Sequence, residues 1–361
     1  MKMRKIVCSF MISVVCFMTA ISGVSATSYD TSKINAAYSK VVEYYKNNNN
    51  LNNADKILAV ESLGLEAESN QFDTSSANLS STSLSKKIVT EVLLGVDPTE
   101  DKKTLESQID ENGNVEGSWG ASSDVWTLYA LYVTSSEKTN LIANKLNDEL
   151  AASSVCGYEW GGTYYADYDT TGWVIEGLAV VNKEKYATTI NKAIDYIKNN
   201  TTMTTTGWVT ADNVDTQSQV LEGMFAYDTN SLLNDSYTIH PIDCLLNTQL
   251  SDGSFPSGYN AEFTTAEVAK TLGTYKNGSV FEKAKKAYDK MMNPEQPDNT
   301  KPAQPTDTKK DSQSTNKVET TNQKTTSVKT GDETNVVIFV SLSMVSGGLF
   351  LVLRKEYERA H

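Results

Sequence analysis

The stretch Gln249-Leu250-Ser251-Asp252-Gly253-Ser254-Phe255, with residues 264–272 (TTAEVAKTL) after it, pairs a glycine-containing loop with a segment whose small residues recur at helical spacing. Three upstream stretches repeat this pairing of loop and helix. They are residues 117–120 (GSWG) with 124–131 (DVWTLYAL), residues 158–162 (YEWGG) with 169–178 (DTTGWVIEGL), and residues 207–208 (GW) with 215–224 (DTQSQVLEGM).

The four copies recur at a nearly constant interval. Aligned on Ala130, Gly177, Gly223 and Thr271, successive copies lie 47, 46 and 48 residues apart. A fixed period in this range indicates a repeat architecture. Each copy predicts a loop, a helix that opens on Asp or Thr, a short turn and a second, more amphipathic helix. All five tryptophans of the chain lie within the repeats.

Two weaker units precede the four copies. They are residues 34–45 with 54–63, and residues 84–94 with 99–109. With these units, residues 27–292 contain twelve expected helices in six hairpins. No stretch has a clear period-two alternation, so we predict an all-α domain. Six helical hairpins can stack as an open solenoid or close into a double-layered ring.

Residues 1–26 have the features of a secretory signal peptide. Three basic residues among the first five precede a mostly apolar run at residues 6–21, and small residues at 24–26 suit cleavage after Ala26. An uncleaved membrane anchor is the alternative. In either case we expect the domain to lie outside the cell.

The C-terminal part contains a linker and an apolar run. Residues 293–330 are rich in Pro, Thr, Gln and Lys, a composition that cannot bury enough apolar area to offset the entropy of ordering, so we predict a disordered linker. Within residues 331–361, the mostly apolar run of 18 residues at 336–353 is just long enough to cross a bilayer as a helix. Arg354 and Lys355 follow, which places this end in the cytoplasm.

The linker ends on Ser327-Val328-Lys329-Thr330-Gly331. With the apolar run and basic tail, this order resembles the cell-wall sorting signal of Gram-positive surface proteins, in which a sortase cuts a Leu-Pro-x-Thr-Gly motif. The resemblance implies cleavage between Thr330 and Gly331 and covalent attachment to peptidoglycan. Ser327 and Val328 stand where Leu and Pro belong, and an uncleaved membrane anchor is the alternative.

The stretch from Gln249 to Phe255 resembles the Gln-x-x-x-Gly-x-aromatic motif of terpenoid cyclase and prenyltransferase α/α toroids. Residues 108–115 (QIDENGNV) are a looser copy, with Gly113 one place late. The resemblance covers residues 30–292 and implies six hairpins closed into a toroid with inner and outer helix layers. That superfamily includes squalene–hopene cyclases, prenyltransferase β-subunits and cobalamin carriers, so the fold does not choose a function.

In a closed ring, the glycine-aromatic loops would meet at one end, beside the N-termini of the inner helices. Aromatic walls with a few polar groups suit a largely apolar or planar ligand. The candidate ligand-binding residues are Trp119, Trp160, Tyr164, Tyr165, Trp173, Trp208, Asp215, Gln219, Phe255 and Tyr259. The alternative is that each aromatic residue only packs its own loop against the next hairpin.

Residues 167–171 (DYDTT) are the clearest indication of an enzyme. They resemble the Asp-x-Asp-Asp motif of class II terpene cyclases, which implies that Asp169, with Asp167 beside it, is the acid that protonates an alkene or epoxide. Thr170 replaces the final Asp, so half of the charge that would keep this acid protonated is missing. Asp169 and Asp215 could instead be helix N-caps.

Composition excludes several classes of function. The chain has 32 Lys and Arg against 45 Asp and Glu, a net charge of −13, and residues 27–292 alone carry −16, which argues against nucleic-acid binding. Two histidines leave no material for a zinc site around His240 or for a Ser-His-Asp triad, and no P-loop or Rossmann fingerprint occurs. Cys156 and Cys244 could form an extracellular disulfide. We expect no metal, and a cofactor only if the resemblance to cobalamin carriers extends to a corrinoid ligand.

These observations predict a protein displayed on the surface of a Gram-positive-type bacterium. Its expected function is to bind a small apolar molecule, such as a corrinoid, or a glycan, at the aromatic end of the domain. Two alternatives are a cyclase-like lyase or isomerase that uses Asp169, and an adhesin that binds proteins through its acidic surface.

Overall fold

The computed structural model describes residues 28–68, 79–200, 214–235, 237, 239–258 and 260–294. All of them belong to one compact unit, Met1–Asp298. The predicted signal peptide, the sorting motif with Thr330 and Gly331, and the apolar run at 336–353 lie outside the described residues.

In these ranges the chain is mostly helical, as predicted, with eleven helices and one two-stranded hairpin. The helices are α2 (Thr31–Asn47), α3 (Ala54–Ser62), α4 (Ser81–Leu93), α5 (Thr99–Ser107), α6 (Ala121–Val133), α7 (Thr139–Ser153), α8 (Tyr168–Asn200), α9 (Val214–Asn234), α10 (Pro241–Leu246), α11 (Ala261–Asn277) and α12 (Val280–Met292). Among the described residues, none of these helices has the length and apolar character needed to cross a membrane.

Short polar side chains begin many of the helices. The Asn53 carboxamide oxygen accepts a hydrogen bond from the Lys56 amide at 3.0 Å, and the Asn260 oxygen accepts from the amides of Glu262 and Phe263. Such caps satisfy N–H groups that have no partner inside the helix. Pro241 occupies the first turn of α10, where a missing N–H is tolerated, and His240 caps that helix through Nδ1.

Two of the helices contain the turn of a predicted helical hairpin. The backbone leaves helical geometry at Asn182 in α8 and at Asp228 in α9, where φ is −166° and −156°. Each side chain then accepts a hydrogen bond from the amide three residues further on. The predicted helix, turn and helix are therefore present, although the turn is a single residue.

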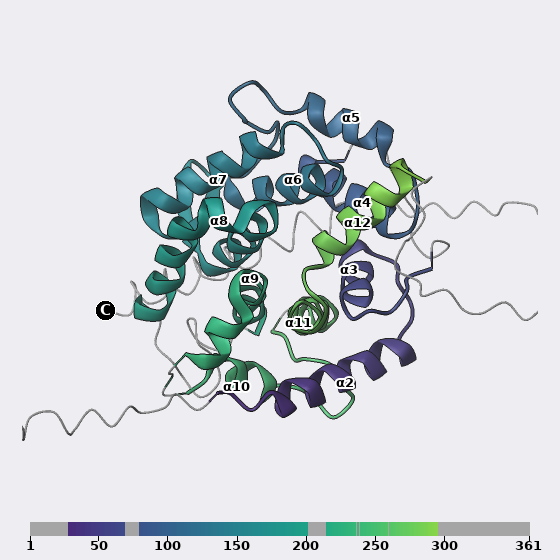
Figure 1. Cartoon of the computed structure of the whole chain (residues 1–361), viewed down its shortest axis with the longest axis vertical. Helices are drawn as coiled ribbons and strands as arrows, with labels where there is room; N and C mark the ends of the chain where they lie inside the picture. The colour runs from purple at the N-terminus through teal and green to yellow at the C-terminus, as the bar shows by residue number, and fades with distance from the viewer. Residues whose placement is uncertain are drawn as a thin grey trace, which may run out of the picture. The chain divides into compact units, whose positions relative to one another are not determined.

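Six helical segments pack in succession: α3, α4, α6, α8, α9 and α11 each contact the next, and α11 also contacts α3 (Figure 1). The helices α2, α5, α7 and α10 lie to the outside of these six in the same view. Of these four, α5 contacts α4 and α6, and α7 contacts α6 and α8. One continuous hydrophobic core joins these contacts.

Glycines set the separation of the neighbouring helices α8 and α9. A Cβ atom added at Gly223 would lie 2.4 Å from the carbonyl oxygen of Gly172, and one added at Gly172 would lie 2.4 Å from that of Gln219. Real side chains do not approach a backbone this closely. The small residues at helical spacing in the repeats are therefore required for helix packing.

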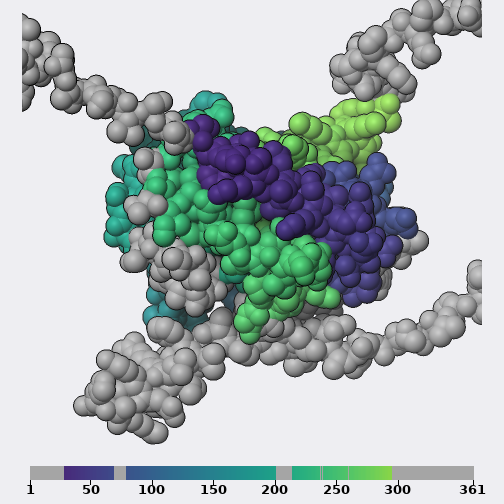
Figure 2. Space-filling view, turned by 90° about the horizontal axis from the view of Figure 1, so that it is seen from below, coloured from purple at the N-terminus to yellow at the C-terminus, as the bar shows by residue number. Residues whose placement is uncertain are grey.

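The first and last parts of the unit are joined by polar contacts. The Tyr29 hydroxyl donates to Asp243 at 2.6 Å, and Lys33 Nζ lies 3.0 Å from the same carboxylate. Lys276 Nζ donates to Asn35 at 3.0 Å. Figure 2 shows the purple α2 lying against the green part of the chain to which α10 and α11 belong.

The final helix differs from its expected place. We expected α12 to complete the last hairpin beside α11, but it also contacts α3, α4 and α6. The Phe281 ring stacks on Tyr129 of α6, with centroids 3.6 Å apart and an interplanar angle of 6°. An apolar face formed by Val280, Phe281 and Ala284 is buried there. The sequence period alone did not indicate this distant surface.

The prediction that no segment is extended is wrong for residues 156–167. Strands β1 (Cys156–Trp160) and β2 (Thr163–Asp167) form an antiparallel hairpin. Gly161 and Gly162 form its two-residue turn with φ of +56° and +77°, a conformation that glycine adopts at little cost. The glycine-aromatic loop of this copy is therefore a regular hairpin.

The stretch from Gln249 to Phe255 is fixed by its own hydrogen bonds. Gln249 Nε2 donates to the carbonyl oxygens of Ala37 and Gly253 at 3.1 Å, and Gly253 has φ of +94°. The loop at Gly113 contains the same backbone hydrogen bond as the loop at Gly253. The Gly113 amide donates to the carbonyl oxygen of Asp110, and the Gly253 amide donates to that of Leu250. Gly113 therefore matches Gly253 of the motif in structure, and Gln108 lies one residue before the position that matches Gln249.

Candidate functional site

Four aromatic side chains, which we call the aromatic rim, lie at and beside the hairpin: Trp119, Tyr158, Trp160 and Tyr165. Trp119, Trp160 and Tyr165 are 40%, 43% and 38% exposed. Trp119 meets Trp160 edge to face, with centroids 6.1 Å apart, and Tyr158 stacks on Tyr165 at 5.5 Å. These rings form an open aromatic surface.

The strand register places the rim on one face of the hairpin. Tyr158 is paired with Tyr165, and Trp160 with Thr163, so these residues share a face because side chains alternate along a strand. Tyr164 must point to the other face, where its hydroxyl donates to Glu149 of α7 at 2.9 Å. The structure therefore separates Tyr164 from Tyr165, which we had placed together.

The backbone holds the rim in place. The Glu159 amide donates to the Trp119 carbonyl at 2.8 Å, which joins the hairpin to the loop before α6. The Trp119 amide donates to Ser123 Oγ at 3.1 Å, and the Cys156 amide donates to Thr171 Oγ1 at 2.9 Å. The backbone that carries the rings is therefore fixed by hydrogen bonds and does not depend on contacts between the rings.

The sequence offered two roles for Asp169, a catalytic acid or a helix N-cap, and the N-cap role belongs to another residue. Asp167, not Asp169, caps α8, because its carboxylate accepts from the amides of Asp169 and Thr170 at 2.8 and 3.2 Å. Asp215 lies inside the first turn of α9, which begins at Val214, and is buried. Neither Asp169 nor Asp215 is therefore an N-cap residue.

Asp169 is nevertheless in a setting that favours its protonated form. Burial raises the pKa of its carboxyl well above the usual value, and the negative charge of Asp167 raises it further. A hydrogen bond with Thr216 opposes the shift. The residue as a whole is partly exposed, while its carboxyl group is buried.

A second group of functional side chains, which we call the polar cluster, is buried among α6, α8, α9 and α11. It consists of Tyr129, Glu176, Gln219, Glu222, Glu267 and Lys270. Four of these six occupy one repeat position, directly before the residues on which the copies align: Tyr129, Glu176, Glu222 and Lys270. Gln219 and Glu267 stand three places earlier in their copies, as do Trp126 and Trp173 in theirs.

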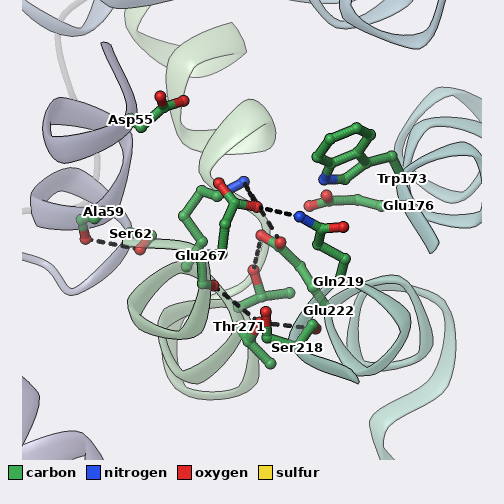
Figure 3. A network of polar contacts seen from close by, with 12 residues as sticks. Asp55, Ala59, Ser62, Trp173, Glu176, Ser218, Gln219, Glu222, Glu267 and Thr271 are labelled. Carbon is green, nitrogen blue, oxygen red and sulfur yellow. Dashed lines mark hydrogen bonds and ion pairs between the residues drawn. The ribbon is translucent and has the colours of Figure 1, made fainter. Parts of the chain in front are cut away.

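The cluster is held together by hydrogen bonds and ion pairs between helices. Lys270 Nζ lies 3.0 Å from Glu267 Oε2 and 3.6 Å from Glu222 Oε2, and Gln219 Nε2 donates to Glu267 Oε2 at 3.2 Å. Figure 3 shows Gln219 and Glu222 facing Glu267, with Trp173 and Glu176 beside them. All four charged side chains are 1% exposed or less.

Glu176 joins the cluster to α6 and to the start of α12. Its Oε2 accepts from the Tyr129 hydroxyl at 3.1 Å, and its Oε1 accepts from Ser279 Oγ at 2.7 Å. The Tyr129 hydroxyl also lies 2.7 Å from the carbonyl oxygen of Trp173. The unexpected place of α12 therefore completes the polar contacts of a buried carboxylate.

Charges within the cluster shift the titration of its members. Burial raises the pKa of Glu222 well above its usual value, against the opposing charge of Lys270, and burial likewise raises the pKa of Glu176. Burial alone would lower the pKa of Lys270, but the charges of Glu222, Glu267 and Glu176 raise it. Lys270 is therefore a permanent cation.

Two tryptophans lie next to the cluster. Trp126 and Trp173 meet edge to face at 5.7 Å, and Lys86 Nζ lies 4.3 Å from the Trp126 ring centroid. Lys86 also pairs with Asp55 at 2.8 Å. Trp173, a predicted ligand-binding residue, is partly buried, and its Nε1 makes no hydrogen bond.

The other predicted residues do not gather at the rim. Phe255 is completely buried, and its amide donates to Thr265 Oγ1, so it packs its own loop and is not a surface residue. Gln219 and Asp215 are buried on α9. Trp208 and Tyr259 lie outside the described residues, as do Thr330 and Gly331.

The sequence did carry a signal for the residues that we missed. Glu-Gly occurs at 176–177 and at 222–223, in register with Lys270-Thr271 and Tyr129-Ala130. A charged or hydroxyl side chain thus recurs beside the small residue of each helix. We interpreted these helices only as small residues at helical spacing and did not consider the polar residue at this repeat position.

Over the part of the chain that the structure describes, no group of three His, Cys, Asp or Glu side chains could hold a metal ion. Within the described residues, Cys156 and Cys244 are both buried and are not joined by a disulfide. A cavity of about 290 Å³ at the end of α2, lined by residues that include Tyr44, Lys56 and Glu262, contains no predicted site residue.

A comparison of the sequence with protein-family models finds no match, and a comparison with curated proteins finds none either.

Proposed function

We propose that residues 27–292 form an α/α toroid that is displayed outside the cell and binds a glycan at the aromatic rim. The proposal of a toroid is supported by the succession of contacts from α3 through α11 and back to α3. The loop of Gln249 and Gly253, which carried the resemblance, supports it as well, because its hydrogen bonds fix the loop against α2.

The observation that carries the binding function is the exposure of Trp119, Trp160 and Tyr165, at 38% to 43%, on a support fixed by backbone hydrogen bonds. Large aromatic side chains are normally buried, and an exposed group of them marks a contact surface. Sugar rings have an apolar face that stacks on aromatic rings and hydroxyls that need polar partners. Thr163, which is exposed and shares the rim's face of the hairpin, supplies a hydroxyl group as a partner.

The same geometry favours a glycan over a corrinoid or another apolar molecule. Small-molecule sites normally bury most of the ligand surface in a concave, largely apolar pocket. The rim is an open surface, on which an apolar ligand would stay largely in water. The charge of −16 on residues 27–292 also argues against acidic glycans.

A glycan array followed by calorimetry with the best neutral or amino sugar tests the binding function. We expect Trp119→Ala and Trp160→Ala each to weaken binding at least tenfold. Leu250→Ala is the matched control, because Leu250 is also exposed, at 45%, but lies on another loop. Binding of cobalamin or of a protein partner in place of any sugar would contradict the proposal.

A second candidate function is acid catalysis by Asp169. It is favoured by the raised pKa of the Asp169 carboxyl, since a general acid must hold its proton at the working pH. Turnover of a polyprenyl substrate that disappears in Asp169→Asn would support a cyclase-like lyase or isomerase. An unchanged rate in that variant would exclude the role of Asp169.

Anchoring to peptidoglycan by a sortase forms part of the proposed function. It rests on the order of motif, apolar run and basic tail. If it is right, the wall-bound protein ends at Thr330, and Thr330→Ala prevents attachment to the wall. Mass spectrometry of an anchored product that still contains residues 336–353 would instead indicate a membrane anchor.

A further inference from the structure

The polar cluster has more negative than positive charge at positions shielded from the solvent. Glu176, Glu222 and Glu267 face the single cation Lys270, and none of the four side chains is more than 1% exposed. With every carboxyl ionised, the cluster would carry a net charge of −2. Burial of uncompensated charge is costly enough that a group normally takes up a proton instead.

The hydrogen bonds show the same imbalance. Three buried oxygens of the cluster have no donor: Gln219 Oε1, Glu222 Oε2 and Glu267 Oε1. Buried polar atoms are nearly always hydrogen-bonded, so a surplus of acceptors requires a further donor. A proton on a carboxyl turns one acceptor into a donor and removes one negative charge.

We infer that the polar cluster is a proton-binding site, in which Glu222 carries a proton at neutral pH. Each of the other two carboxylates is better compensated. Both oxygens of Glu176 accept hydrogen bonds at 3.1 Å or less, and Glu267 is 3.0 Å from Lys270. Glu222 has only a 3.4 Å contact from Thr274 and a 3.6 Å distance to Lys270.

The groups around Glu222 explain why it keeps the proton. From α8 it meets the charge of Glu176, from α11 those of Glu267 and Lys270, and from α6 the hydroxyl of Tyr129. The remaining neighbour of α9 is α10, whose Asp243 is engaged by Tyr29 and Lys33. The raised pKa of Glu222 agrees with this arrangement.

The retained proton makes the stability of the domain depend on pH. The Glu222 carboxyl has an ordinary pKa near 4.5 in the unfolded chain and a higher one in the folded domain. Its contribution to stability is therefore full below about pH 4.5 and is lost as the pH rises toward the folded pKa. For each retained proton, the folding equilibrium constant falls about tenfold per pH unit in that window.

Urea unfolding between about pH 6 and 8.5 tests the inference through the linkage of stability to proton binding. We expect Glu222→Gln, which mimics the protonated carboxyl, to reduce the proton uptake on folding by about one relative to the wild type. Glu137→Gln, at an exposed position, is the matched control and should keep the wild-type slope. Asp169→Asn is measured in parallel, because burial also raises the pKa of the Asp169 carboxyl.

Equal slopes for the wild type and Glu222→Gln would overturn the inference. If that variant does not fold, Glu222→Met offers a non-titrating side chain of similar volume. A readout with Glu222 intact is the infrared band of protonated carboxyl groups in Asp169→Asn at neutral pH. The absence of that band would also overturn the inference, whether or not the rim binds a glycan.

Discussion

The aromatic rim and the polar cluster come from the same repeats. Aromatic side chains are normally buried and charged ones exposed, and both groups depart from this rule. The rim exposes Trp119, Trp160 and Tyr165 to water, while the cluster buries three carboxylates and a lysine. Rim residues stand in loops that differ between copies, whereas four of the cluster residues share one repeat position. Because the loops can vary without disturbing helix packing, we expect the rim to determine binding and the cluster to determine stability.

The largest effect is expected from removing the cation of the cluster. Lys270→Met leaves the charges of Glu176 and Glu267 buried without a compensating cation, so we expect the free energy of unfolding to fall by about 3–5 kcal/mol. Urea unfolding at neutral pH measures this loss. Lys103→Met is the control, because Lys103 pairs with Glu100 at an exposed position, and it should leave stability nearly unchanged. Equal losses would contradict the special role of Lys270.

The next effect concerns the glycine beside Glu222. In Gly223→Ala the new Cβ would lie 2.4 Å from the Gly172 carbonyl oxygen, so α8 and α9 must separate. We expect a loss of about 1–3 kcal/mol in thermal or urea unfolding. Gly258→Ala, where a Cβ meets nothing within 4 Å, should leave stability nearly unchanged. A Gly223→Ala protein as stable as the wild type would show that the helix contact is looser than described.

A smaller effect is expected for a single hydroxyl of the cluster. Tyr129→Phe keeps the ring stacked on Phe281 but removes the hydrogen bonds to Glu176 and to the Trp173 carbonyl. We expect a loss of about 1–2 kcal/mol in the free energy of unfolding. Tyr165→Phe at the exposed rim should change stability by less than about 0.5 kcal/mol. The comparison fails if the two variants are equally stable.

The smallest effect on stability is expected at the rim. Trp119→Ala and Trp160→Ala remove exposed rings and one edge-to-face contact, so each should cost less than about 1 kcal/mol. The same variants should lose glycan binding in calorimetry. A destabilisation above about 2 kcal/mol would mean that the rim is part of the fold and would remove the contrast with the cluster.

Much of the fold could be predicted because the repeats have a fixed interval and because glycines mark close helix contacts. The helices and the loop at Gly253 agree with the sequence interpretation. Closure of the helices into a toroid stays a proposal.

The hairpin was missed because its alternation spans only five residues on each side of Gly161 and Gly162. A five-residue strand rich in aromatic residues is hard to distinguish from a loop when its neighbours are helices. The place of α12 could not be predicted, because a helical period shows which residues share a face but not which distant helix that face meets.

The candidate site was predicted only in part, for a related reason. Trp119 and Trp160 were identified because the sequence shows aromatic residues next to glycines in the predicted loops. The cluster was overlooked because Glu176, Glu222 and Lys270 differ in charge, and only their aligned positions show that they meet. Phe255 was placed at the rim because the motif shows that it is aromatic but not that it faces the core.

The position of α12 has a mechanical consequence. The helix ends at Met292, directly before the predicted linker, so any tension applied through that linker would load α12 first. It resists through the ion pair of Lys283 with Glu61 at 2.6 Å, the stacking of Phe281 on Tyr129, and the hydrogen bond of Ser279 to Glu176. Pulling on the C-terminal end would therefore strain the buried carboxylates before the hairpin, and the rim would keep its shape until α12 gives way.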